Sequence, residues 1–146
     1  MPGRIRATYA VCVLALAFAY QDASSAQQPK TVADGVYSRD QAERGKKAYG
    51  VFCENCHAAD LGGTNSGDSG APPLRRDGFM AGSNANALFS KIAESMPFDA
   101  PGSLPKTDYL DILAYLFQEN GFPAGSAPLP VDAAQLGAIR IIRVAP

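Results

Sequence analysis

The sequence predicts an all-α fold with three main helices, long connecting loops and an irregular C-terminal tail. Residues 39–52 and 106–120 both carry apolar side chains at three- and four-residue spacing, and a shorter segment does so at 87–96. Residues 58–79, between the segments 39–52 and 87–96, are rich in glycine and proline, which predicts a long loop. No segment predicts a substantial sheet, so these observations favour one small helical domain.

The first helix is expected at residues 39–52. Ser38 and Gln41 form the S-x-x-Q pattern of a capping box directly before and within its first turn. Glycine in a helix interior is less favourable than alanine, so Gly45 indicates the close approach of another helix. The residues that recur on one face of this helix are Ala42, Gly45, Tyr49 and Phe52.

Two further helices follow the loop. The shorter one, at residues 87–96, has Asn84 or Asn86 as its N-terminal cap. The longer one, at residues 106–120, has the clearest apolar stripe in the chain, and Gly121 is its C-terminal cap. That stripe consists of Tyr109, Ile112, Leu113 and Leu116.

The N-terminus has the features of a secretory signal peptide. Two arginines precede an uncharged run at residues 9–20, and Ser24 and Ala26 are the small residues that a signal peptidase reads. The run is shorter than the roughly 20 apolar residues that a membrane-spanning helix needs. We therefore expect a cleaved signal peptide at residues 1–26 and a periplasmic protein, with an uncleaved anchor as the alternative.

The remaining chain, about 120 residues long, is expected to divide into three parts. Residues 27–37 are a polar leader, residues 38–122 are the folded domain, and residues 123–146 are a C-terminal extension interrupted by prolines. The β-leaning run at 139–144 is expected to pack on the surface. The formal charge of −1 argues against a nucleic-acid-binding protein.

The stretch FCENCHAADLGG, residues 52–63, holds Cys53, Cys56 and His57, the single histidine of the chain. A thioredoxin-like pair is expected within a βαβ pattern, and a structural zinc site usually has four protein ligands. The first does not fit, because nothing around the pair predicts a strand, and the second lacks a fourth ligand, because the third cysteine, Cys12, leaves with the signal peptide. The C-x-x-C-H pattern predicts covalent haem attachment, with both thiols bonded to haem and the histidine on iron. A plain structural disulfide is the alternative.

These features together resemble class I c-type cytochromes, which are small monohaem electron carriers. The resemblance covers about residues 36–122. It rests on the capped first helix, the C-x-x-C-H motif, the APPL stretch, the methionine in SMPFDAPGSLP and the last helix. It implies a small cytochrome c fold in which three main helices surround one covalently bound haem c and a long loop wraps it.

The resemblance also implies specific contacts. In this family the first and last helices cross closely, so Gly45 and Tyr49 should face the last helix. The residues expected there are Ile112, Leu113 and Tyr115. A proline carbonyl supports the proximal histidine in this family; Pro72 is the expected residue, with Pro73 as its rival.

The second iron ligand is expected to be Met96. With one histidine in the chain, bis-histidine ligation is impossible, which leaves Met80, Met96, a lysine or water. A thioether stabilises ferrous iron and raises the potential. Met96 precedes Pro97 in a rigid loop, whereas Met80 is interpreted as a residue that fills the core.

These residues favour an electron-transfer protein over an enzyme, with no catalytic residues. The tail resembles cytochromes that accompany periplasmic quinoprotein dehydrogenases, which implies such a dehydrogenase as donor and an oxidase or another cytochrome as acceptor. We expect no nucleic-acid partner and no stable membrane insertion after signal cleavage. A haem enzyme or a gas or peroxide sensor with an open sixth site is the alternative, and a piece of a larger dehydrogenase complex is a third hypothesis. The basic residues near the motif, Lys46, Lys47, Arg75 and Arg76, are interpreted as a solvated face more readily than as a docking patch.

Overall fold

The computed structural model describes most of the chain beyond the expected signal peptide. The described residues are 30–64, 70–75, 80 and 83–142. The expected signal peptide at residues 1–26, with Cys12 inside it, lies outside these ranges, and so does Arg76. No helix within the described ranges is long and apolar enough to cross a membrane.

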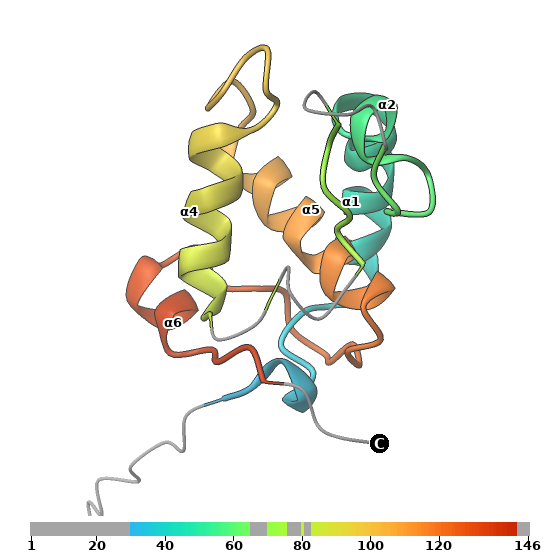
Figure 1. Ribbon diagram of the computed structural model, residues 1–146. Coiled ribbons are helices and arrows are strands. Elements are labelled where there is room, and N and C mark those ends of the chain that lie inside the picture. Colours follow the sequence, from blue (N-terminus) through green and yellow to red (C-terminus); the bar gives the residue numbers. More distant parts are fainter. Residues whose placement is uncertain (1–29, 65–69, 76–79, 81–82, 143–146) are drawn as a thin grey trace, which may run out of the picture.

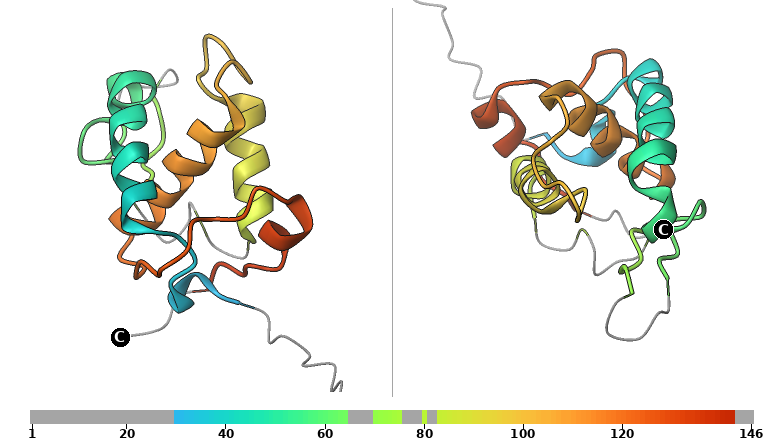
Figure 2. Two further views of the ribbon diagram at one scale, coloured as in Figure 1. Left: turned by 180° about the vertical axis from the view of Figure 1, so that it is seen from behind. Right: turned by 90° about the horizontal axis from the view of Figure 1, so that it is seen from above.

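Helices make up the regular structure of the described residues, and only isolated β-bridges occur beside them. The helices are η1 (Val32–Asp34), α1 (Arg39–Phe52), α2 (Glu54–His57), α4 (Ala85–Ser95), α5 (Lys106–Glu119) and α6 (Ala133–Gly137). The three longest are α1, α4 and α5, and α5 lies between the other two (Figures 1 and 2). The prediction of an all-α fold with three main helices is therefore confirmed.

The start of α1 follows the predicted cap only in part. The Ser38 hydroxyl accepts a hydrogen bond from the Gln41 N–H at 3.2 Å, as expected. The Gln41 side chain does not complete a capping box, because it is buried and its Oε1 accepts the Leu129 N–H at 2.8 Å. Phe52, which was expected on the buried face, is 42% exposed at the end of the helix. The buried residues of α1 are Gln41, Ala42, Gly45 and Tyr49.

The crossing of α1 and α5 confirms the close approach predicted at Gly45. A Cβ added at Gly45 would lie 1.8 Å from the backbone oxygen of Asp111. The rings of Tyr49 and Tyr115 meet further along the same crossing, with centroids 5.3 Å apart. Arg44 binds Asp111 through two hydrogen bonds of 2.7 and 3.0 Å at the edge of this contact. The crossing therefore fixes α1, and the motif that follows it, on α5.

The caps of the other two main helices also agree with the predictions. Asn84 rather than Asn86 caps α4, because its Oδ1 accepts the Ala87 N–H at 2.9 Å. Gly121 has a φ of +82° just beyond α5, which is the left-handed conformation of a C-terminal cap. The predicted stripe on α5 was too narrow, since every residue from Tyr109 to Phe117 is buried. Helix α5 is thus the central helix of the domain.

The end of the chain packs differently from the prediction. Ile139 and Ile141 are 3% and 5% exposed, although the run 139–144 was expected to lie on the surface. Their neighbour Arg140 donates its N–H to Lys30 O at 2.8 Å, and Ile141 donates to Ser83 O at 2.9 Å. The described part of the run therefore pairs with the leader on one side and with the start of α4 on the other, which buries Ile139 and Ile141, whereas Ile142 is exposed and residues 143–144 lie outside the described ranges.

The leader also contributes to the core. Val32, Val36 and Tyr37 are all buried. The Tyr37 hydroxyl donates to Phe122 O at 2.7 Å, and the Gly125 N–H donates to Tyr37 O at 2.7 Å. The packed structure therefore continues on both sides of the predicted domain at 38–122.

Candidate functional site

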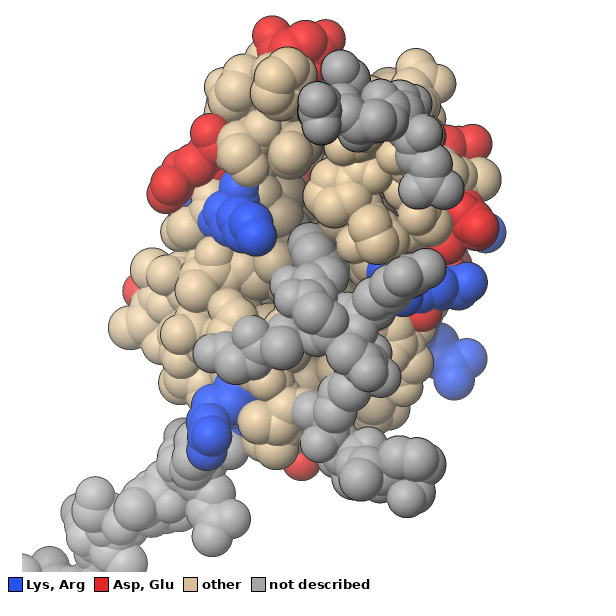
Figure 3. Space-filling model, in the orientation of Figure 1, with Lys and Arg blue, Asp and Glu red and all other residues tan. Residues whose placement is uncertain are grey.

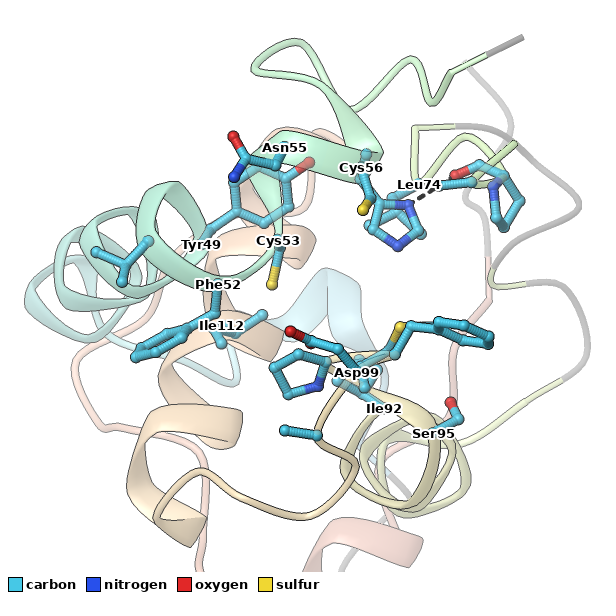
Figure 4. A pocket seen from close by; sticks show the side chains of 18 of the residues that line it. Tyr49, Phe52, Cys53, Asn55, Cys56, Leu74, Ile92, Ser95, Asp99 and Ile112 are labelled. Atoms are coloured by element: carbon cyan, nitrogen blue, oxygen red, sulfur yellow. Dashed lines mark hydrogen bonds between the residues drawn. The ribbon is translucent and has the colours of Figure 1, made fainter. Parts of the chain in front are cut away.

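A pocket of about 1110 Å³ opens between the two outer helices. One wall consists of the end of α1 and helix α2, with Cys53 and Cys56, and the opposite wall carries Ile92, Ser95 and Asp99 (Figure 4). Ligand pockets for small molecules usually measure about 300–1,000 Å³, so this one has room for a large cofactor. Apolar side chains dominate its lining.

One helical turn brings the C-x-x-C-H residues to this pocket. Cys53 ends α1 and begins α2, and its carbonyl accepts the His57 N–H at 2.9 Å. Residues three and four positions apart share one face of a helix, so Cys53, Cys56 and His57 all line the pocket. Cys53 is half-buried and Cys56 is exposed, and both are free thiols. The described residues contain no converging group of three or more His, Cys, Asp and Glu side chains.

The environment of Cys53 differs from that of a redox-active cysteine. Burial, together with the smaller effect of the neighbouring Cys56, raises the pKa of its thiol to about 11. Redox-active C-x-x-C pairs have lowered pKa values, because the thiolate is the reactive form. Cys53 is therefore protonated at neutral pH, which does not favour a thioredoxin-like function.

His57 is buried, and its orientation is fixed by a backbone group. Its Nδ1 lies 2.9 Å from Pro72 O. Because a carbonyl oxygen only accepts hydrogen bonds, Nδ1 must carry the hydrogen, and Nε2 keeps its lone pair for a metal. Of the two candidates, Pro72 and not Pro73 makes this contact. Its role as the support of an iron ligand stays a prediction.

A close backbone contact places the Pro72 carbonyl. The Thr64 N–H donates to Ala71 O at 3.1 Å, so the two ends of the loop lie side by side. Gly63 sits at this contact with a φ of +75°, and an added Cβ would lie 2.4 Å from Ala71 O. Only glycine fits here without displacing the backbone that leads into Pro72.

Tyr49 holds the turn that follows His57. Ala58 has a φ of +62°, which is unusual for a residue with a side chain. The Tyr49 hydroxyl donates to Ala58 O at 2.7 Å, and the Gly63 N–H donates to His57 O at 3.0 Å. Burial also raises the pKa of Tyr49, so this hydroxyl stays a hydrogen-bond donor. Helix α1 therefore supports both the thiols before this turn and the imidazole at its start.

The two candidate methionines occupy different environments. Met96 follows α4, donates its N–H to Ile92 O at 2.9 Å and lines the pocket. Met80 is 5% exposed within the hydrophobic core and is not among the residues that line the pocket. This arrangement agrees with the roles expected for both, although the iron-ligand role of Met96 stays a prediction.

Sequence patterns did not reveal several residues of the site. Val51, Phe52 and Phe98 line the pocket and are 70%, 42% and 86% exposed, and no periodicity indicates such an apolar rim. Tyr109 was identified only as part of a helical stripe, but its hydroxyl donates to Met96 O at 2.7 Å. The signal for this bond was available, because a buried tyrosine hydroxyl usually has a partner.

The described basic residues near the motif, Lys46, Lys47 and Arg75, do not line the pocket. Lys46 and Lys47 are exposed on α1. Arg75 forms an ion pair with Glu119 and donates its Nε–H to the Glu119 backbone oxygen at 3.2 Å. Uncharged residues cover most of the visible described surface in this orientation (Figure 3).

Comparisons with known proteins do not assign the chain to a family. No protein-family model and no curated protein matches it. Among solved structures, the chain is similar to the sulfane dehydrogenase SoxCD from Paracoccus pantotrophus, with a TM-score of 0.45 and 19% sequence identity. The match covers 66% of this chain and 53% of that chain, so this chain corresponds to about half of its neighbour's length. The similarity is too low to support an argument about function.

Proposed function

We propose that this protein is a monohaem c-type cytochrome of class I that carries single electrons between a donor and an acceptor protein. The observation that supports it best is the shared pocket of about 1110 Å³. The thiols of Cys53 and Cys56 and the oriented imidazole of His57 lie on one wall of this pocket. Met96, which carries a thioether, also lines it. These donors match those of a covalently attached haem with histidine and methionine as axial ligands.

Each of these residues has a distinct role in this proposal. Cys53 and Cys56 would hold the haem covalently, through thioether bonds formed when each S–H adds across a vinyl group. His57 offers Nε2 as one axial ligand, because its Nδ1–H is held by Pro72 O. Met96 would supply a thioether as the second iron ligand, and the site would then not admit a substrate to iron. A bound haem would supply a one-electron iron couple in an apolar environment.

The rim of the pocket suits brief contact with redox partners. Val51, Phe52 and Phe98 give it exposed apolar side chains. Such a surface allows a partner to approach without the strong ion pairs that slow release. We propose a periplasmic quinoprotein dehydrogenase as the donor and an oxidase or another cytochrome as the acceptor. The signal-peptide features at residues 1–26 support a periplasmic location, and the mature chain should begin near Gln27 by mass spectrometry.

Haem retention after denaturing electrophoresis tests the attachment. The chain, produced in bacteria that attach haem c, should retain haem in the gel. Cys53→Ala combined with Cys56→Ala should lose this signal, whereas Cys12→Ala should keep it, because Cys12 belongs to the expected signal peptide. A double variant that still carries haem would reject the proposal.

The ferric optical spectrum separates an electron carrier from a haem enzyme or sensor. A carrier with methionine on iron should show the sulfur-to-iron band at the red end of the spectrum and should bind cyanide slowly. If the parent protein lacks this band and binds cyanide at once, its sixth site is open. That outcome would favour the enzyme or sensor.

A further inference from the structure

We infer that Tyr109 is a positioning residue, which holds Met96 at the pocket through the backbone of the segment that carries it. This inference rests on the proposed function, because it takes Met96 as an iron ligand. The Tyr109 hydroxyl donates to Met96 O at 2.7 Å. The Tyr109 hydroxyl oxygen also accepts a hydrogen bond from the Leu104 N–H at 3.4 Å. One side chain on α5 thereby bonds both ends of the segment 96–104.

The segment 96–104 forms much of the pocket wall that faces the C-x-x-C-H turn. Its first turn is held locally, by the Ala100 N–H donating to Pro97 O at 3.0 Å, and the next by Ser103 donating to Ala100 O at 3.2 Å. These bonds shape the segment but do not fix its position on the rest of the domain. The Met96 N–H bonds to Ile92 O on α4 at 2.9 Å, and the Tyr109 hydroxyl connects the Met96 carbonyl to α5.

Tyr109 is well placed to act as a fixed point. Its side chain is 3% exposed, and its ring meets the edge of Phe89 on α4, with centroids 6.4 Å apart. Lys106 in turn places its Nζ 5.7 Å from the centre of the Phe89 ring. Tyr109 also belongs to α5, the helix on which α1 packs at Gly45. Helix α5 therefore connects the wall that carries the thiols with the segment that carries Met96.

Removing this hydroxyl should release Met96 more than it unfolds the domain. Tyr109→Phe keeps the buried ring but leaves Met96 O and the Leu104 N–H without their partner. The segment should then open more often, and each opening exposes the sixth iron position. An equilibrium weakened by one or two hydrogen bonds shifts by roughly tenfold.

The test compares Tyr109→Phe with Tyr37→Phe in the haem-loaded protein. Tyr37 is a matched control, because its buried hydroxyl also donates to a backbone oxygen at 2.7 Å, that of Phe122, which unlike Met96 does not line the pocket. Tyr109→Phe should bind cyanide about tenfold faster than the parent and show a weaker sulfur-to-iron band. Tyr37→Phe should lose similar stability in urea and keep the parent's cyanide rate and band.

Two outcomes overturn the inference, and they differ in what they say of the proposed function. If Met96→Ala accelerates cyanide binding while Tyr109→Phe behaves as Tyr37→Phe does, Met96 is a ligand but Tyr109 does not position it. If Met96→Ala changes neither the band nor the rate, Met96 is not a ligand, and the ligand assignment fails as well.

A second measurement uses the parent protein, so it does not depend on whether a variant folds. In the parent protein, hydrogen exchange of the Leu104 amide and cyanide binding should accelerate together in mild denaturant, below the unfolding transition. This joint increase supports the inference, because both events require the Tyr109 bonds to open. Cyanide binding that accelerates while the Leu104 amide stays protected overturns it.

Discussion

His57 and Pro72 are joined by a contact of 2.9 Å between Nδ1 and a backbone oxygen, across 15 residues of chain. The imidazole is therefore oriented by the path of the backbone and not by the chemistry of a side chain. A substitution that leaves this path intact should leave His57 in place, whereas a change in the path should tilt it. Gly63 is the residue through which the path can be changed.

Gly63→Ala should destabilise the protein strongly. A Cβ here meets Ala71 O at 2.4 Å, in addition to the cost of a positive φ, which is about 1–2 kcal/mol. We expect a total loss of at least about 3 kcal/mol in urea unfolding, with a shifted haem potential. Gly121→Ala is the control, because its φ is also positive but nothing lies within 4 Å of the added Cβ. Equal losses for the two variants would contradict the proposed steric role of Gly63.

Gly45→Ala should separate the two crossing helices. The added Cβ would lie 1.8 Å from Asp111 O, a backbone atom that cannot move without displacing α5. Overpacking of this kind costs about 1–3 kcal/mol or more, and we expect the upper end in thermal or urea unfolding.

Gly50→Ala in the same helix is the control for that experiment. The nearest atom to its added Cβ is Glu54 Oε2, at 3.4 Å, and alanine favours a helix by about 0.5–1 kcal/mol over glycine. This variant should be as stable as the parent or slightly more so. Equal destabilisation by both variants would show that helix propensity, and not the contact with Asp111, decides the effect.

In the haem-bound protein that we propose, Met96→Ala should lower the midpoint potential and leave the haem attached. Loss of the thioether removes the preference for ferrous iron, and cyanide or carbon monoxide should bind much faster. Met80→Ala should instead cost about 2–5 kcal/mol of stability, because Met80 is buried in the core, without a change in potential. Redox titration and unfolding of both variants distinguish the two roles, and a potential that shifts only in Met80→Ala would reverse the assignment.

The thiols of the haem-free chain should differ in reactivity. Cys56 is exposed, whereas burial raises the pKa of Cys53 from 9.0 to about 11. Iodoacetamide at pH 8 should therefore label Cys56 first, and Cys53 should react only as the pH approaches 11. The Cys53 thiol ionises at a lower pH in the unfolded chain than in the folded one. Its ionisation therefore lowers the free energy of unfolding progressively between pH 9 and 11 and has no effect below pH 9. Peptide mass spectrometry after timed labelling gives the order, and equal rates would contradict it.

Local chemistry made the helix ends predictable. Ser38, Asn84 and Gly121 each act within a few residues of their own position, so the sequence alone is enough to assign them. The crossing at Gly45 was predictable for a related reason, since a costly residue inside a helix suggests a compensating contact. The C-x-x-C-H residues were likewise close enough in sequence to share one helical turn.

Contacts between distant segments could not be predicted in the same way. The pairing of Gln41 with Leu129 replaced an expected local cap, because a buried amide takes the partner that the tertiary fold supplies. Nothing in the periodicity of residues 139–144 identifies Lys30 or Ser83 as their partners. The bond of Tyr109 to Met96 O was missed for the same reason, since a helical stripe indicates burial but not what a hydroxyl meets.

The pairing of Arg140 with the leader determines when the fold can be completed. Its N–H binds Lys30 O, and its own carbonyl accepts the Val32 N–H at 3.0 Å. A chain that crosses a membrane with its N-terminus first must therefore deliver nearly its whole length before these bonds can form. Under the export that we propose, Cys53 and Cys56 would reach the far side during that interval, before these bonds hold the two ends of the fold together. This order of emergence would give a modifying enzyme access to Cys53 before the fold half-buries it, whereas Cys56 is exposed in the folded chain as well.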